Sequence, residues 1–321
     1  MSAEKALVFD IYRGTSHDGP GQRNTVFFKG CPLSCRWCHN PEGISPKRLV
    51  WWQSRLCIGC LLCHEACKTG ANIPGENGIY IDRDKCIACG ACAKACPAEA
   101  MTLCGEEWNL DHLVKEMAKY KPYYDVTGGG VTASGGEAMM QHDFIRPFFK
   151  ALHQNGITTA LDTCGFIKAE YYDEVLPFTD YILYDLKIFD AERHKYFCGQ
   201  DNALILNNAK HIISSIVSGE INSEFWIRTP LIPGATDDET NIGMIASFIV
   251  NDLGSCNISK WELCSFNNSC ISKYDRLGKS WEFKGEKILT RSKINALMNT
   301  AVSAGFPKEK LFATGIINEE A

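Results

Sequence analysis

GCPLSCRWCHN, residues 30–40, carries three cysteines, Cys31, Cys35 and Cys38, at the spacing C-x3-C-x2-C. A structural metal site normally uses four protein ligands, whereas a catalytic site keeps one coordination position open. Three ligands so close together therefore predict a metal centre with one position left for a small molecule.

The chain has an unusual number of cysteines for its length, 17 in 321 residues. Small secreted domains use cysteines for disulfides, but this chain is long and its N-terminus lacks the apolar segment of a secretion signal. We therefore expect a cytoplasmic protein whose clustered cysteines bind metal or carry out redox chemistry. Six cysteines stand apart, and for each a small buried apolar residue is the favoured interpretation: Cys104, Cys164, Cys198, Cys256, Cys264 and Cys270.

Eight further cysteines form two runs with the same spacing, C-x2-C-x2-C-x3-C: Cys57, Cys60, Cys63 and Cys67, then Cys86, Cys89, Cys92 and Cys96. Bacterial two-cluster ferredoxins have this spacing, and the fourth cysteine of each run ligates the cluster of the other run. The pattern predicts one 4Fe–4S cluster on the first three cysteines of the first run with Cys96. It predicts another on the first three cysteines of the second run with Cys67.

Two zinc sites are the alternative for these runs. The small residues between the cysteines favour clusters, because main-chain N–H groups can then approach the cluster sulfurs. The eight ligands leave no fourth cysteine for the segment 30–40. A third iron–sulfur cube held there by three thiolates would keep one iron free to bind a small molecule.

Composition excludes several classes of protein. The chain is 45% hydrophobic and 22% charged, which is typical of a globular protein. Its net charge of −5 provides no basic field, so we expect no nucleic-acid partner. No apolar run approaches the roughly 18 residues of a membrane-spanning helix, so we expect no membrane association.

Outside the cysteine-rich segment, runs typical of β-strands alternate with amphipathic stretches typical of helices. The strand candidates are Thr25–Phe28, Val131–Gly136, Thr158–Asp162, Tyr181–Asp185, Phe225–Arg228 and Trp261–Cys264. Helical spacing of apolar residues recurs in 110–117, 145–152, 205–216 and 242–249, with Asp237 and Asp238 as cap candidates for the last. This alternation favours a parallel α/β sheet or barrel, interrupted by a module at residues 51–104.

Polar or ligating residues stand where these strands end. They are Cys31, Gly135, Gly136, Glu137, Asp162, Thr163, Asp185, Lys187, Arg228 and Asn267. Taken singly, each has an ordinary explanation, such as a helix cap or a solvated charge. Ligands of parallel α/β folds bind at the C-terminal ends of strands, so we expect these residues to converge on one face.

The chemistry of that face suggests its ligand. Glu137 would hold an ammonium group, and the glycines before it let the main chain approach closely. Arg228 and Lys187 would hold a carboxylate, and Trp37 offers a flat surface for stacking. An amino acid joined to an aromatic base would satisfy all of these groups.

The three-cysteine segment, with an aromatic residue before its last cysteine, resembles the signature of radical S-adenosylmethionine (radical SAM) enzymes. More narrowly, HDGPGQRNTVFFKGCPLSCRWCHNPEG resembles the activating enzymes of glycyl radical enzymes. GGGVTASGGEAMMQ, LDTCGF, YDLK and WIRTPLIPGATDDETN resemble the pyruvate formate-lyase activase of that family. The insert resembles that of the longer activases. The fold implied is α/β, a partial (β/α)6 radical SAM barrel with an inserted bacterial ferredoxin-like module.

The resemblance implies a reaction. The open iron chelates SAM, and one electron cleaves SAM to methionine and a 5′-deoxyadenosyl radical. That radical removes a hydrogen atom from a glycine of a partner glycyl radical enzyme. The residues implied to bind SAM are Trp37, Cys38, His39, Gly135, Gly136, Glu137, Asp162, Thr163, Asp185, Leu186, Lys187, Arg228 and Asn267.

Within this set the resemblance assigns finer roles. Asp162 and Asp185 correspond to a monovalent-cation site beside the SAM carboxylate. Asp18 and Lys187 are the candidates for catalysis, with Asp18 on the substrate-facing side. Asn267 stands where the family has a SAM-contacting histidine. Asparagine can hydrogen-bond but cannot titrate near neutral pH, which puts a proton-transfer role at this position in doubt.

The expected organisation is a radical SAM core in residues 1–50 and 105–321, with the insert at 51–104. The expected cofactors are three 4Fe–4S clusters, SAM and a monovalent cation. The expected partners are a glycyl radical enzyme and a flavodoxin or ferredoxin that donates electrons. Two other functions remain open from the sequence: radical SAM chemistry on a small molecule or peptide, and electron transfer alone, which would not need the strand-end residues.

Overall fold

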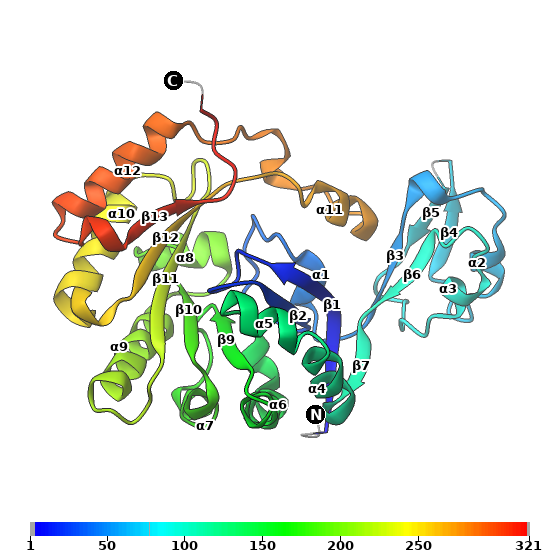
Figure 1. The fold of residues 1–321 in the computed structure, drawn as a ribbon. Helices are drawn as coiled ribbons and strands as arrows, with labels where there is room; N and C mark the ends of the chain where they lie inside the picture. Colours follow the sequence, from blue (N-terminus) through cyan, green and yellow to red (C-terminus); the bar gives the residue numbers. More distant parts are fainter. Residues whose placement is uncertain (1–3, 77, 320–321) are drawn as a thin grey trace.

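The computed structural model describes residues 4–76 and 78–319, and its centre is a nine-stranded sheet with the order β13-β12-β11-β10-β9-β8-β2-β1-β7. Its parallel strands are β2 (Arg23–Phe28), β8 (Gly130–Gly135), β9 (Thr158–Thr163), β10 (Tyr181–Asp185), β11 (Glu224–Leu231), β12 (Lys260–Ser265) and β13 (Leu311–Thr314). They curve into an open barrel with helices outside (Figure 1). The predicted partial (β/α) barrel is confirmed, and β13 extends the predicted set of parallel strands.

Helices connect the strands: α1 (Pro41–Ile44), α4 (Leu110–Ala118), α5 (Lys121–Thr127), α6 (His142–Gln154), α7 (Ala169–Val175), α8 (Ala191–Cys198), α9 (Ala203–Val217), α10 (Glu239–Phe248), α11 (Ile271–Leu277) and α12 (Arg291–Ser303). The apolar stretches predicted to be helical form α4, α6, α9 and α10. Asp238 caps α10, because its side chain accepts a hydrogen bond from Asn241 N at 2.8 Å. The apolar faces of these helices pack on the sheet in one large buried cluster.

Two strands at one edge of the sheet were not predicted, β1 (Lys5–Thr15) and the short strand β7 (Glu106–Asn109). β1 runs antiparallel to both of its neighbours, β2 and β7. The two strands extend the sheet beyond β2, on the side where the insert is attached. β1 pairs with β2, which precedes the insert, and with β7, which follows it, so β1 holds both connections of the insert to the barrel.

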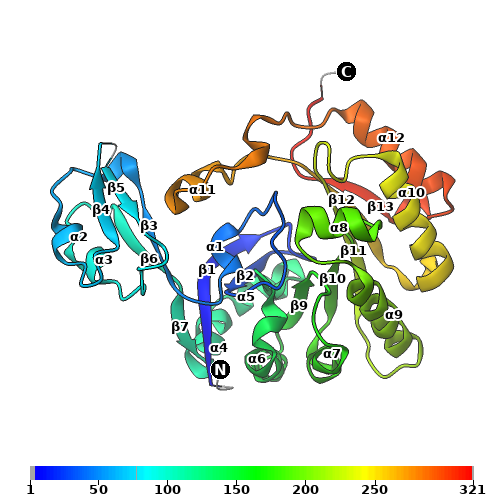
Figure 2. The same cartoon turned by 180° about the vertical axis from the view of Figure 1, so that it is seen from behind.

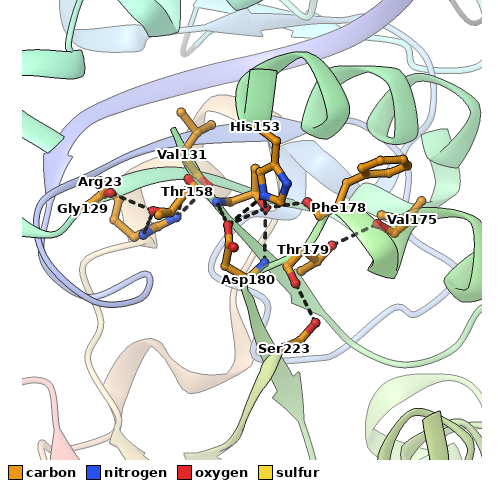
Figure 3. A network of polar contacts seen from close by, with 11 residues as sticks. Arg23, Gly129, Val131, His153, Thr158, Val175, Phe178, Thr179, Asp180 and Ser223 are labelled. Carbon is orange, nitrogen blue, oxygen red and sulfur yellow. Dashed lines mark hydrogen bonds and ion pairs between the residues drawn. The ribbon is translucent and has the colours of Figure 1, made fainter. Parts of the chain in front are cut away.

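A polar network ties together the N-terminal ends of the parallel strands (Figure 3). The guanidinium of Arg23, fully buried, donates to the main-chain oxygens of Val131 and Thr158, each at 3.0 Å. Next to it, His153 Nε2 lies 2.9 Å from an oxygen of Asp180. A buried arginine is stable only when its donors are satisfied, so these bonds hold the N-terminal ends of β2, β8 and β9 together.

The segment from Leu49 to Cys104 forms a small module beside the barrel (Figures 1 and 2). It contains two ribbons, β3 (Leu49–Trp52) with β6 (Met101–Cys104) and β4 (Asn72–Gly75) with β5 (Gly78–Ile81), and two short helices, α2 (Leu62–Glu65) and α3 (Ala91–Ala95). A separate apolar cluster holds it together. No helix within residues 4–76 and 78–319 is long and apolar enough to cross a membrane.

Candidate active site and cluster sites

A cavity of about 590 Å³ opens at the C-terminal ends of the parallel strands. Most residues predicted to bind the open cluster or SAM line it: Cys31, Cys35, Trp37, Cys38, His39, Gly135, Gly136, Asp162, Thr163, Asp185, Lys187, Arg228 and Asn267. The fold thus brings together, around one cavity, residues that are far apart in the sequence.

Main-chain hydrogen bonds fix the three-cysteine loop from two sides. At its start, Cys31 N donates to the oxygen of Ile44 in α1 at 3.0 Å. In its middle, Ser34 N donates to the oxygen of Cys198 at the end of α8 at 2.9 Å. All three cysteines line the cavity. The loop therefore presents three thiols to a common space, as an open cluster requires.

The two glycines at the end of β8 are required by close packing against this loop. Gly135 has a φ of +122°, and a Cβ on it would lie 2.4 Å from main-chain atoms of Phe28. A Cβ on Gly136 would lie 2.4 Å from the oxygen of Gly30. Only glycine fits these positions, which bring the main chain of β8 against the start of the cysteine loop.

Glu137 lies behind the cavity wall rather than on it. Its carboxylate is 1% exposed and accepts hydrogen bonds from Cys164 N at 2.7 Å, Thr163 Oγ1 at 3.0 Å and Met139 N at 3.1 Å. Burial raises the pKa of Glu137, while these bonds oppose the rise. The carboxylate therefore ties the end of β8 to the end of β9.

Alternating charges cross the floor of the cavity. Arg228 Nη1 lies 3.3 Å from Asp162 Oδ1, and its Nε lies 3.6 Å from Glu262 Oε2. Lys187 forms an ion pair with Asp185. Burial raises the pKa of Asp162 to about 6, against the effect of Arg228 and with a further rise from Asp185. The floor thus offers both cations for a carboxylate and two neighbouring carboxylates for a cation.

Two other predicted residues do not line the cavity. Asp18 lies in the loop before β2, where its Oδ2 accepts a hydrogen bond from Thr25 Oγ1 at 2.8 Å. Leu186 is buried, and its N–H donates to the main-chain oxygen of Arg228 at 2.9 Å. His17, next to Asp18, lines the cavity instead.

The sequence reasoning missed part of the cavity wall: Ser16, His17, Cys164, Lys260, Glu262, Cys264, Ser265, Thr314, Gly315 and Ile316. The sequence offered a signal for Glu262, because a glutamate interrupts the apolar strand WELC. It offered no signal for the residues of and after β13, because LFAT was not recognised as a strand.

Aromatic packing surrounds the last cysteine of the loop. Trp37 lines the cavity but is only 4% exposed, with its ring 5.9 Å from that of Phe197. The ring of His39 meets Trp281 edge-on at 6.0 Å. Asn267 is held in a turn, because its Oδ1 accepts a hydrogen bond from Ser269 N at 3.1 Å.

The scattered cysteines differ in their surroundings. Cys104, Cys164, Cys198 and Cys270 are buried as expected, Cys264 is half-buried, and Cys256 is exposed, so the buried interpretation is wrong for Cys256. Two of the buried thiols contact the cysteine loop, Cys198 through Cys35 and Cys164 through Cys31. These contacts place two further sulfur atoms next to the cysteine loop.

The two ferredoxin-like runs fold into loops of the same backbone shape. Gly59 and Leu61 of the first run have positive φ, and so have the matching Ala88 and Gly90 of the second. Positive φ at alternate residues turns successive N–H groups towards one side, which is how loops surround anionic centres. The repeated strain at Leu61 and Ala88 indicates that both loops are built for the same kind of ligand.

A cavity of about 270 Å³ lies within the first loop. The four cysteines assigned to the first cluster all line it: Cys57, Cys60, Cys63 and Cys96. In the second site, Ala71 N donates to Cys67 Sγ at 3.2 Å, and the next residue, Asn72, lies beside the Cys92 thiol. The folded chain therefore brings the fourth cysteine of each run towards the other run. Within the described ranges, no three His, Cys, Asp or Glu side chains gather tightly enough for a single metal ion.

Comparisons with known proteins agree with this chemistry. Residues 79–102 match the family described as "4Fe-4S binding domain". The chain is 41% identical over 283 residues to the trans-4-hydroxy-L-proline dehydratase activating enzyme of Clostridioides difficile, covering 88% of this chain and 90% of that protein. It is 37% identical to the (2S)-3-sulfopropanediol dehydratase activating enzyme of Klebsiella oxytoca, covering 89% and 90%.

A solved structure shows the same fold. A radical SAM methyltransferase from Sphaerobacter thermophilus superposes with a TM-score of 0.53 at 12% identity, covering 99% of this chain and 74% of that one. Fold, cysteine loop and relatives together define a radical SAM, iron–sulfur enzyme. The chain belongs to the family of activating enzymes of glycyl radical enzymes. The predicted family and the predicted kind of activity are confirmed, and the alternatives of small-molecule chemistry and of electron transfer alone are not favoured.

Proposed function

We propose that the cavity at the strand ends is where this activating enzyme binds SAM on an open 4Fe–4S cluster held by Cys31, Cys35 and Cys38. The observation that carries the proposal is the cysteine loop facing paired charges across about 590 Å³. When bound, the cluster supplies the electron that cleaves SAM, and the resulting 5′-deoxyadenosyl radical takes a hydrogen atom from the partner's glycine. The protein binds, orients and shields these groups.

Different residues are proposed to hold different parts of SAM. The main chain at Gly135 and Gly136 receives the methionine amino end, and Arg228 with Lys187 receives the carboxylate. The adenosine lies along Trp37, Cys38 and His39, which continue the loop. Glu137 and Leu186 act from behind the wall by holding the strand ends in place, and Asn267 shapes the rim.

Asp162 and Asp185 are proposed to bind a monovalent cation beside the SAM carboxylate. Both line the cavity, and both carry a cationic partner, Arg228 and Lys187 respectively. A small cation between the two carboxylates would offset their mutual repulsion, which contributes to the raised pKa of Asp162. Asp18 follows His17, which lines the cavity, and we propose that Asp18 stands on the side from which the partner's glycine approaches.

The module at residues 51–104 is proposed to hold two further 4Fe–4S clusters, one on Cys57, Cys60, Cys63 and Cys96 and one on Cys86, Cys89, Cys92 and Cys67. With the open cluster this makes three. Clusters ligated entirely by cysteine suit electron transfer rather than substrate binding. We propose that they pass electrons from a flavodoxin or ferredoxin to the open cluster.

A direct test combines the reconstituted protein, SAM and the glycyl radical enzyme encoded nearest to its gene. The expected result is an EPR doublet from a glycyl radical on the partner, together with 5′-deoxyadenosine. SAM cleavage with no radical on any such partner would count against the proposed substrate.

A further inference from the structure

The ribbon of β3 and β6 gives the module a near end and a far end relative to the barrel. Leu49 pairs with Cys104 and Trp52 pairs with Met101. Gly105, directly after β6, packs against the side chains of Arg48 and of Leu7 in β1. The pair of Leu49 and Cys104 therefore lies next to the barrel, and the pair of Trp52 and Met101 lies at the far end.

The second cysteine run lies at the near end of this ribbon. Gly90, between Cys89 and Cys92, is buried, and a Cβ on it would lie 3.4 Å from the side chain of Leu103. Arg83, just before the same run, donates through Nη1 to the oxygen of Val50 at 2.6 Å. Leu103 and Val50 are paired neighbours one step from the barrel.

The first cysteine run lies at the far end. The cavity of its first three cysteines is lined by Trp52, Ala100 and Met101, in addition to Cys57, Cys60, Cys63 and Cys96. Exposure does not distinguish the two runs, because Ile58 in the first is 68% exposed and Ile87 in the second is 70% exposed. The strand register is what separates them.

Helix α11 connects the near end of the module to the three-cysteine loop. On the module side, Arg83 Nη2 donates to Leu277 O at 3.3 Å, and the guanidinium of Arg276 lies 4.9 Å from the centre of the Trp51 ring. Figure 2 shows α11 reaching across from the barrel towards the module.

On the barrel side of the same helix, Tyr274 OH donates to Cys38 O at 2.9 Å. Lys273 Nζ lies 2.7 Å from Asn40 Oδ1 and 2.8 Å from the buried carboxylate of Glu42. α11 is therefore bonded on one side to the module and on the other to the cysteine loop.

We propose that the module's clusters work in series, with the second-run cluster next to the open cluster, the first-run cluster outermost, and α11 as the positioning element between module and cysteine loop. The proposal rests on the relay proposed above. One electron leaves the reduced donor protein, enters at the first-run site, passes through the second-run site and is consumed when SAM is cleaved. The donor is oxidised by one electron for each SAM cleaved.

Magnetic coupling between reduced clusters tests the order without relying on activity. Cys60→Ala and Cys89→Ala variants, reconstituted anaerobically, are each expected to lose about four irons. The EPR signal of the open cluster is recognised by its change on adding SAM. Its coupling to a neighbour should persist in Cys60→Ala and disappear in Cys89→Ala. The opposite pattern would overturn the order.

An Arg276→Ala variant keeps every cysteine and so remains informative if a cysteine variant loses both module clusters. It should show weaker coupling and slower reduction of the open cluster by a protein donor, with full iron content. Lys279→Ala, an exposed lysine just beyond α11, is the matched control and should behave as the parent. Coupling and reduction unchanged in Arg276→Ala would overturn the role of α11.

The order and the relay can fail separately. If the coupling follows the proposed order but flavodoxin-driven and dithionite-driven cleavage fall equally in both cysteine variants, the relay is wrong and the order stands. If only flavodoxin-driven cleavage falls but the coupling is lost in Cys60→Ala alone, the relay stands and the order is wrong.

Discussion

The hydroxyl of Tyr274 donates a hydrogen bond to the main-chain oxygen of Cys38 at 2.9 Å, although the two residues are 236 positions apart. The tyrosine ring stacks on Trp281 at 5.5 Å, so the hydroxyl is held in place by packing. This bond fixes the last cysteine of the open-cluster loop from the side of α11.

Tyr274→Phe removes only this bond and keeps the ring. Because one hydrogen bond contributes about 1 kcal/mol, we expect iron of the open cluster to be lost to a chelator about fivefold faster. Iron release followed by absorbance under anaerobic conditions measures this rate. Tyr80→Phe, an exposed tyrosine of the module, is the control, and equal rates in both variants would contradict the role of the bond.

Replacing Cys31, Cys35 and Cys38 together by alanine tests the open site. Three clusters hold about twelve irons, so the variant should retain about eight and cleave no SAM. Iron analysis and detection of 5′-deoxyadenosine give both results. Retained SAM cleavage in this variant would show that the cavity is not the catalytic site.

Glu137→Ala should weaken SAM binding and leave the iron content unchanged. The carboxylate accepts bonds that hold the end of β9, and each charge-assisted hydrogen bond contributes roughly 1.5–3 kcal/mol, which is about tenfold or more in affinity. Isothermal titration with SAM measures the loss. Glu170→Ala, an exposed glutamate of α7, should bind as the parent does, and unchanged affinity in Glu137→Ala would refute the role of the strand end.

Asp162→Asn tests the cation site. Removing one carboxylate charge should abolish any stimulation of SAM cleavage by potassium. The parent should still cleave SAM faster in a buffer with potassium than in one without it. Asp84→Asn, at an exposed carboxylate of the module, is the control. A variant that responds to potassium as the parent does would place the cation elsewhere.

Cys60→Ser and Cys89→Ser test the relay with two reductants. Dithionite can reach the open cluster directly, so cleavage driven by it should largely persist, whereas cleavage driven by flavodoxin or ferredoxin should fall much further. Metal binding and folding are coupled, so the alternative is that these clusters only hold the module together. Equal loss with both reductants, in variants that remain soluble and bind SAM, would favour that alternative.

The predictable part of the fold was the part with strong local patterns. β8, β9 and β10 are short, mostly buried runs bounded by turns, and the residues after them follow from the rule for parallel sheets. β7 reads EEWN and β13 reads LFAT, and neither is long or apolar enough to stand out. They become strands because they pair with β1 and β12, and a local sequence pattern cannot predict such pairing.

Side-chain orientation was harder to predict than position. Glu137 was expected to face the ligand, but bonding groups on β9, some 26 residues away, turn its carboxylate into the wall. α11 was missed as a connection for the same reason, since Tyr274 and Arg276 meet partners in the cysteine loop and the module. Such contacts depend on the packed structure rather than on spacing along the chain.

Hydrogen transfer from the partner's glycine is the most direct test of the proposed activity. The glycyl radical enzyme is prepared with glycine deuterated at Cα and incubated with the reconstituted activating enzyme, SAM and a reductant. We expect 5′-deoxyadenosine to gain one deuterium as the glycyl radical signal forms, as measured by mass spectrometry and EPR. Unlabelled 5′-deoxyadenosine, formed while SAM is cleaved and no glycyl radical accumulates, would contradict the activity.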